Sequence, residues 1–363
     1  MMRVKLKDIT NYSKGSQINR DILLENGKYI YLNGGINPSG KWNAYNVSSK
    51  TITISEGGNS SGYINYITEP FWCGAHCYYL FDGPKNTKYL YYALKSQQER
   101  LFKIRSGACM PNIKKKDLGN FEFEFDFNEK IQIKIVSILD ECNKIINNYK
   151  LELELLDELV KARFVELFGD PVYNEKQWKV EQFGSLGELK RGKSKHRPRN
   201  DPILLGGKYP LIQTGDISNS HTYIQTYKST YSEEGLKQSK MWKAGTLCIT
   251  IAANIAESAI LTFDACFPDS IVGFLPNDKV NLIFIHHWLD FLQPILEENA
   301  PAVAQKNLNV ATLEKVGVIL PPLELQNQFA DFVKEVDKSR LEVQKSLKKT
   351  QELFDSLMQK YFG

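Results

Sequence analysis

The chain contains one long helical pattern twice, and this repeat constrains its fold more than any other feature. Over residues 128–169, apolar residues recur at alternating spacings of four and three, which is the pattern of a coiled-coil seam. A shift of 194 residues places Gln132 on Gln326 and Phe168-Gly169 on Phe362-Gly363. Each helix would contain roughly 40 residues and extend about 60 Å. Because such helices are long for a globular domain, we expect them to act as spacers that pack on each other.

The predicted seam of the first helix has one off-period step, from Tyr149 to Leu153, and the second has its own at the matching place, from Val343 to Leu347. The first seam contains Ile131, Ile135, Ile138, Cys142, Ile145, Tyr149, Leu153, Leu156, Val160, Phe164 and Leu167. The second contains Leu325, Phe329, Phe332, Val336, Ser339, Val343, Leu347, Thr350, Phe354, Met358 and Tyr361. The shared stripe predicts an antiparallel helical pair.

The repeat extends into the segments before each helix. A shift of 195 places Tyr91-Tyr92 on His286-His287, and a shift of 177 places Lys14-Gly15 on Arg191-Gly192. The chain is therefore a tandem duplication. We predict an α+β fold with pseudo-two-fold symmetry, in which two similar globular domains are separated by two long antiparallel coiled-coil helices. The expected order is a first domain at 1–127, a helix at 128–171, a second domain at 172–320 and a helix at 321–363.

Short β-type runs separated by glycine-rich turns predict the strands of the first domain. They lie at 28–32, 51–55 and 63–68, and are followed by an expected helix at 87–102 and an alternating strand at 118–127. The second domain should repeat this plan, with a loop-rich entry at 188–209, a strand pair within 246–263 and a helix at 282–298.

Composition places the chain among ordinary globular proteins. It has 363 residues, and 42% of them are hydrophobic, which is enough to form two hydrophobic cores. The net charge of +4 says little by itself about binding partners. Six cysteines without regular spacing indicate reduced thiols rather than a disulfide framework. The first residues, MMRVKLKD, do not resemble a signal peptide, and the most apolar run, 246–263, is interrupted by polar residues. We therefore expect a cytoplasmic protein without a membrane span.

Gly187 to Ser194 formally matches the phosphate-binding loop G-x-x-x-x-G-K-[ST]. That motif works only between a buried strand and a helix whose N-terminus faces the phosphates. The residues that follow, Lys195-His196-Arg197-Pro198-Arg199, are poorly suited to starting a helix. A nucleotide-dependent enzyme is therefore the least favoured interpretation of the chain.

Two groups could bind metal, and for both we favour a packing role. Cys73, His76 and Cys77 are closely spaced, but no second pair supplies further ligands. His286-His287 aligns with Tyr91-Tyr92, which favours packing over ligation. The sequence also lacks a glycine-rich S-adenosylmethionine loop and a recurring nucleophile set. We predict no catalytic residue, no metal site and no cofactor on this chain.

A basic segment in the second domain predicts contact with DNA. Residues 190–199 contain six Lys or Arg in ten positions, and Gly and Pro make the segment a loop suited to phosphate contacts. Polar turn residues could read base edges, because Asn and Gln pair well with adenine. The candidate DNA-binding residues are Lys14, Arg20, Lys41, Lys190, Arg191, Lys193, Lys195, Arg197, Arg199, Gln213, Ser218 and Asn219.

Two passages make the chain resemble a known family over essentially its full length. NIKKKDLGNFEFEFDFNEKIQIKIVSILDE and KNLNVATLEKVGVILPPLELQNQFADFVKEVD are similar to the passage from recognition domain into helix in the specificity subunits of type I restriction-modification enzymes. Pro321, Pro322 and Gln326 complete the pattern in the second copy, whereas the first copy has Phe125-Asp126 where prolines are usual.

The resemblance implies a non-catalytic subunit that reads double-stranded DNA. Each recognition domain would read one half of a split, asymmetric target, and the helices would set the distance between the halves. Two modification subunits that bind S-adenosylmethionine would dock on the helices and methylate adenine, and restriction subunits that use ATP and Mg²⁺ can join them. The residues by themselves leave open a coiled-coil scaffold with two protein- or glycan-binding domains.

Overall fold

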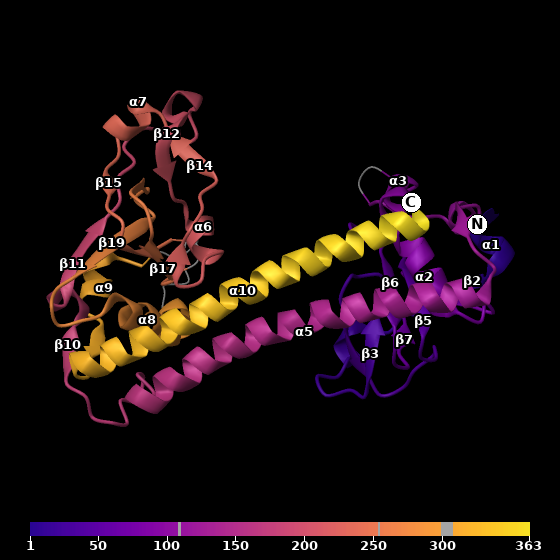
Figure 1. The fold of residues 1–363 in the computed structure, drawn as a ribbon, viewed down its shortest axis with the longest axis horizontal. Coiled ribbons are helices and arrows are strands. Elements are labelled where there is room, and N and C mark those ends of the chain that lie inside the picture. The colour runs from indigo at the N-terminus through magenta and orange to yellow at the C-terminus, as the bar shows by residue number, and fades with distance from the viewer. Residues whose placement is uncertain (108–109, 253–254, 299–307) are drawn as a thin grey trace. The chain divides into compact units, whose positions relative to one another are not determined.

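The computed structural model describes residues 1–107, 110–252, 255–298 and 308–363. Lys306 and Asn307, which begin the second quoted passage, lie outside the described residues. The chain forms two compact units. Unit 1 contains Met1–Leu151 and Gln344–Gly363, and unit 2 contains Glu152–Val343. Each unit therefore holds one globular domain together with one part of each long helix (Figure 1).

The described residues of unit 1 form three small sheets. A four-stranded antiparallel sheet has the order β2 (Asn11–Lys14), β8 (Cys77–Phe81), β5 (Thr51–Ser55) and β6 (Ile64–Ile67). A mixed sheet contains β4 (Gly40–Trp42), β3 (Tyr29–Leu32) and β7 (Trp72–Cys73), and a third pairs β1 (Met2–Lys5) with β9 (Glu122–Phe125). The short helices are α1 (Leu6–Ile9), η1 (Arg20–Ile22), α2 (Thr87–Lys95), α3 (Gln98–Lys103) and α4 (Lys115–Gly119).

Unit 2 repeats this arrangement with additions. Its main sheet has the order β11 (Gly187–Arg191), β19 (Ile271–Pro276), β16 (Leu247–Thr250), β17 (Ser258–Leu261) and β13 (Tyr223–Ile224). A second sheet has the order β14 (Ser229–Tyr231), β12 (Leu205–Leu211), β18 (Ala265–Cys266) and β15 (Met241–Trp242). A third sheet pairs β10 (Val180–Gln182) with β20 (Gly317–Ile319). Its helices are η2 (Phe183–Ser185), η3 (Pro202–Leu204), α6 (Thr214–Ser218), α7 (Glu233–Lys237), α8 (Leu282–Glu298) and α9 (Val310–Glu314).

The strand order confirms the duplication. The series β2-β8-β5-β6 in unit 1 corresponds to β11-β19-β16-β17 in unit 2, and β4-β3-β7 corresponds to β14-β12-β18. The parallel strand pair in these smaller sheets is also equivalent in the two units. In unit 1, β3 pairs parallel with β7, and in unit 2, β12 pairs parallel with β18. Two sequences that differ in most loops thus form the same α+β domain.

The two long helices, α5 (Glu129–Phe168) and α10 (Leu323–Phe362), confirm the two long helices predicted from the repeated apolar pattern. The side chain of Asn128 accepts hydrogen bonds from the backbone N–H groups of Lys130 and Ile131, which caps the start of α5. Gly169 has a φ of +77° and ends that helix. Each helix contributes residues to both units (Figure 1).

Within each unit the two helices pack in antiparallel fashion. In unit 1, Ile135 and Leu139 from the start of α5 share a core with Met358 and Phe362 from the end of α10. In unit 2 the ends are reversed: the core combines Val160, Phe164 and Phe168 from the end of α5 with Phe329, Val333 and Val336 from the start of α10. The helices are therefore part of each domain's hydrophobic core.

The predicted seam is displaced by one residue in the first half of α5. Ile131 is 42% exposed and does not belong to the seam, and Ile138 and Ile145 are only half-buried. Leu139 and Ile146 are the buried residues at these positions. The pattern could not decide between neighbours because 138–139 and 145–146 are both apolar pairs. With Leu139 and Ile146 in place, the spacing alternates regularly through Leu153, and the off-period step at Tyr149 disappears.

The second helix departs from its predicted seam in the same way. Ser339 is exposed, and Arg340 is buried in its place. The guanidinium of Arg340 pairs with Asp157 of α5 at 2.6 Å. The remaining predicted packing positions are buried or half-buried; they are Ile135, Tyr149, Leu153, Leu156, Phe164, Leu325, Phe329, Phe332, Val336, Val343, Leu347, Phe354 and Met358.

Three shorter predictions need correction. The helix expected at 87–102 is broken into α2 and α3, because the chain turns at residues 96–97. The strand expected at 118–127 is restricted to β9, since its first residues end α4. The entry at 188–209 is less loop-rich than expected, because β11 and β12 extend into it. The strand pair within 246–263 and the helix at 282–298 are confirmed.

The repeated glutamine and phenylalanine have equivalent structural roles in the two copies. Gln132 donates to the carbonyl of Asp126 at 2.6 Å, and Gln326 donates to that of Pro321 at 2.9 Å, so each fixes the backbone that enters its helix. Phe168 packs on Phe284 of α8, and Phe362 packs on Tyr89 of α2, which is the residue equivalent to Phe284 by the shift of 195. Both glutamines and both phenylalanines are buried.

None of the helices in the described part of the chain combines the length and apolar composition that crossing a bilayer requires.

Candidate functional site

The basic loop predicted at residues 190–199 is only partly a loop, because Lys190 and Arg191 form the end of β11. The rest of this basic loop leaves β11 and lies against the segment that precedes β19. Arg191 donates to the backbone carbonyl of Asp269, and Arg197 and Arg199 each pair with a different oxygen of the Asp269 carboxylate, Arg197 at 3.3 Å. All three arginines are exposed. Asp269 therefore gathers three guanidinium groups on one surface while leaving them open to solvent.

Hydrogen bonds from outside the loop fix its backbone. The side-chain oxygen of Gln238 accepts from the backbone N–H groups of Lys195 at 2.6 Å and His196 at 3.2 Å. Ser239 donates to the carbonyl of Lys193 at 2.9 Å. The side chains of Lys193 and Lys195 are exposed, so the held backbone presents their charges to solvent.

Lys240 is a basic residue beside this loop that sequence reasoning missed. Burial, together with the nearby charges of Lys190 and Lys193, lowers the pKa of Lys240. Its ammonium lies 3.7 Å from the ring centroid of Trp242. Lys190 itself pairs with the exposed Glu188 on the same strand. The cationic surface of unit 2 is therefore larger than the loop that the sequence singled out.

The phosphate-binding-loop interpretation is wrong. Residues Gly187–Arg191 form strand β11, which pairs antiparallel with β19, and the residues that follow form no helix before the three-residue η3. A Cβ on Gly192 would lie 2.3 Å from the carbonyl oxygen of Pro268. Gly15 of the first copy approaches the carbonyl of Cys73 in the same way. The glycine thus permits close backbone packing at one sheet end in both units.

Two of the three predicted base-reading residues line separate cavities, and the third, Asn219, lines neither of them. Gln213 precedes α6, where its backbone N–H donates to Asp216 at 2.9 Å, and its exposed side chain lines a cavity of 270 Å³ together with Arg199. Ser218 hydrogen-bonds to Glu257 and lines a different, polar cavity. Asn219 is exposed and donates to the carbonyl of Gly215. The structure therefore brings Arg199 and Gln213 together and separates Ser218 from them.

The candidates of unit 1 are less concentrated. Lys14, at the end of β2, forms an ion pair with Glu56, and Arg20 lines a 430 Å³ cavity to which Glu56 and His76 also contribute. Lys41 is exposed on β4 and does not line this cavity. Unit 1 thus places Lys14 and Arg20 near one acidic side chain, while Lys41 lies apart.

The two sulfur atoms considered as metal ligands face the protein interior. Cys73 and Cys77 are buried, and the Cys73 thiol donates to the carbonyl of Cys77 at 3.3 Å. A hydrogen bond with the side chain of Cys77, and then burial, raise the pKa of Cys73. The packing role expected for His76 is wrong, because its side chain is 62% exposed and faces Glu56 at 3.3 Å.

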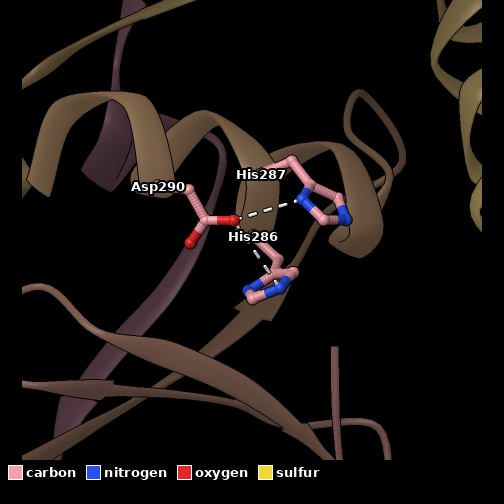
Figure 2. Close-up of side chains that lie close together, drawn as sticks. All are labelled: His286, His287 and Asp290. Atoms are coloured by element: carbon pink, nitrogen blue, oxygen red, sulfur yellow. Dashed lines mark hydrogen bonds and ion pairs between the residues drawn. The ribbon is translucent and has the colours of Figure 1, made fainter. Parts of the chain in front are cut away.

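His286 and His287 lie in the polar cavity of unit 2, which has a volume of 390 Å³. Figure 2 shows both imidazoles beside the carboxylate of Asp290 on the same helix, α8. Burial lowers the pKa of His286 to about 4, so this imidazole is neutral near pH 7. Burial also raises the pKa of Asp337, which lines the same cavity. Alignment with Tyr91-Tyr92 could not reveal this environment.

Comparison with known proteins explains the duplicated architecture. The family model of the type I restriction modification DNA specificity domain matches residues 1–156 and 175–353, one segment for each copy of the repeat. The chain belongs to this family. The resemblance inferred from the two sequence passages is thereby confirmed, and no finding supports the scaffold alternative. The chain is a specificity subunit of the type I restriction-modification class, with two DNA specificity domains.

Relatives of the specificity family extend over almost the whole chain. A putative type I specificity subunit of Mycoplasma genitalium is 24% identical over 376 residues, which cover 98% of this chain and 92% of that protein. A putative type I specificity subunit of Mycoplasma pneumoniae is 26% identical over 378 residues, covering 98% and 94%. The crystal structure of a type I restriction-modification S subunit from M. genitalium has a TM-score of 0.65 at 21% identity, covering 100% of this chain and 96% of that one. This likeness confirms the fold.

Proposed function

We propose that the chain reads a split, asymmetric DNA target and has no catalytic role of its own. Each unit would read one half of the target, and α5 and α10 would set the distance between the halves. The observation that carries the proposal is the cluster of Arg191, Arg197 and Arg199 around Asp269 on the surface of a DNA specificity domain. Exposed guanidinium groups bind phosphates and can contact guanine, and Gln213 beside Arg199 suits adenine.

The long helices would provide the docking surface for two modification subunits. Leu155 and Leu159 lie one turn apart on α5 and are about half exposed, at 58% and 47%. Leu341 on α10 is exposed as well. Apolar side chains at this spacing suit a partner helix. The modification subunits would bind S-adenosylmethionine and methylate adenine, and restriction subunits would add ATP- and Mg²⁺-dependent cleavage.

The proposal can be tested by producing the chain together with a type I modification subunit from the same genome and mapping methylated adenines across the genome of the expression host. We expect methylation at one split motif with two defined halves, present only when this chain is produced. An assembled complex that leaves the genome without such a motif would contradict the proposal.

A further inference from the structure

The polar cavity of unit 2 has an excess of negative charge. It is lined by residues of α5, α6, α8 and α10, of the segment that precedes β13, and of the start of β17 with the residue before it. Four carboxylates and two fixed positive charges face it: Asp157, Glu257, Asp290 and Asp337, with Lys161 and Arg340. Arg340 pairs with Asp157 at 2.6 Å and lies 3.7 Å from Asp337, so among the described residues that line the cavity Lys161 is the one other fixed cation beside Glu257 and Asp290. A cavity of this composition favours a cationic ligand over an anionic one.

His286, His287 and Asp290 have the separations of ligands on one ion. Oδ2 of Asp290 lies 3.1 Å from Nδ1 of His287 and 3.9 Å from Nε2 of His286 (Figure 2). All three ligand atoms lie within 4.8 Å of one another. Two donors bound at about 2.1 Å to a tetrahedral Zn²⁺ are roughly 3.4 Å apart. The two distances in the structure bracket this value.

A second hydrogen bond holds His286 in a suitable orientation. Its Nδ1 lies 2.9 Å from the hydroxyl of Ser258 on β17, which leaves Nε2 facing Asp290. Metal-binding histidines generally use their other ring nitrogen in this way. The three side chains come from one helix, α8, so little backbone ordering is needed to assemble them.

The first copy of the domain has a side-chain ammonium in place of the acidic ligand. The shift of 195 places Tyr91, Tyr92 and Lys95 on His286, His287 and Asp290. The ammonium of Lys95 donates to the carbonyl of Ile64 at 3.0 Å and lies 3.9 Å from the ring centroid of Tyr63. At equivalent positions, unit 1 therefore supplies a cation of its own, whereas unit 2 supplies groups that bind one.

We propose that His286, His287 and Asp290 bind a divalent transition-metal cation of the Zn²⁺ class. Two imidazoles and one carboxylate form a donor set that suits this class better than Mg²⁺ or Ca²⁺. Water completes the coordination in the cavity. Because Asp157 and Lys161 of α5 and Asp337 of α10 line the same cavity, the bound cation strengthens the attachment of the second domain to its helices. The proposed metal site does not depend on the proposed role in DNA recognition, and it is tested by measuring the metal content of the chain.

The test uses the full chain, freed of metal by chelation and then titrated with Zn²⁺, with metal content measured after removal of free ion. We expect one Zn²⁺ per chain and an increase in the thermal unfolding temperature. Asp290→Asn and His287→Asn should each lower the affinity more than about tenfold, because even loss of an outer partner costs roughly 10–100-fold. Co²⁺ in place of Zn²⁺ should give a visible absorption band that both variants lose.

His76→Asn is the matched control, since it removes the exposed histidine beside Cys73 and Cys77 in unit 1. This variant should bind Zn²⁺ as the unmodified chain does. Thermal unfolding measured without metal establishes that each variant is folded. A variant that does not fold is replaced by Asp290→Lys, which carries the residue that the first copy of the domain has at this position. Three outcomes would overturn the proposal. The chain could take up no stoichiometric Zn²⁺, the α8 variants could bind Zn²⁺ with unchanged affinity, or His76→Asn could lose Zn²⁺ binding.

Discussion

At the scale of single residues, Asp269 determines how the basic loop is presented. It holds Arg197 and Arg199 through its carboxylate and Arg191 through its backbone carbonyl. Exposed ion pairs of this kind contribute little to stability. We interpret the arrangement as one that keeps two guanidinium groups paired until phosphates replace the carboxylate.

Asp269→Asn should therefore strengthen nonspecific DNA binding. The change removes the competing charge and frees Arg197 and Arg199, and each added phosphate contact steepens the dependence of log affinity on log salt by about 0.9. The measurement is a salt titration of DNA affinity by the chain in complex with its modification subunits.

Asp278→Asn is the control for this experiment, because Asp278 is exposed in the same unit and its loss changes the net charge equally. It should leave the salt dependence unchanged. An equal gain in both variants would show that net charge alone is responsible, and weaker binding in Asp269→Asn would mean that the carboxylate positions the arginines for DNA.

At the scale of elements, the register of α5 is the feature that the structure changes most. Apolar periodicity correctly identified both helices and their pairing, but α5 ends at Phe168 rather than at 171, and α10 begins at Leu323 rather than at 321. It could not choose between Ile138 and Leu139, or between Ile145 and Ile146, because either neighbour continues an apolar stripe. The choice depends on the core residues that α5 meets, which come from segments distant in the sequence.

The corrected register predicts unequal costs for two similar substitutions. Ile146→Ala removes buried methyl groups and should lower the free energy of unfolding by about 2–4 kcal/mol. Ile131→Ala removes exposed groups and should change it by less than about 0.5 kcal/mol. Urea unfolding of both variants measures the difference. Equal costs, or a larger cost for Ile131→Ala, would restore the register expected from the sequence.

The exposed leucines of α5 give a second prediction at this scale. Leu155→Ser combined with Leu159→Ser should leave folding nearly unchanged, since both side chains are exposed, but should weaken assembly with the modification subunit at least tenfold. Size-exclusion chromatography of mixed subunits measures the assembly. Ile203→Ser, which removes a side chain of 60% exposure from η3 in the recognition domain, should assemble normally. Equal behaviour of the two variants would exclude this face of α5 as the docking surface.

At the scale of the whole molecule, the duplication was predictable because the two copies have matching residues at nearly constant shifts in the sequence. The sheet order was not, since β2 pairs with β8 and β11 with β19 across long separations that no local pattern encodes. The candidate site was predictable only in part. Clustered charges identified the basic loop, but Asp269 lies 70 residues beyond Arg199, and Lys240 belongs to a different segment. The sequence singled out His286-His287, but it could not show the polar cavity that they line in unit 2, because that cavity is formed by α5, α8 and α10 together.

The central claim is that each unit reads its own half of one DNA target. It is tested most directly by exchanging residues 172–320 for the corresponding segment of a family member with a different target, and mapping adenine methylation by the assembled complex. We predict that one half of the methylated motif changes to that of the donor while the other half and the spacing remain. An unchanged motif, or a change in both halves, would contradict the account.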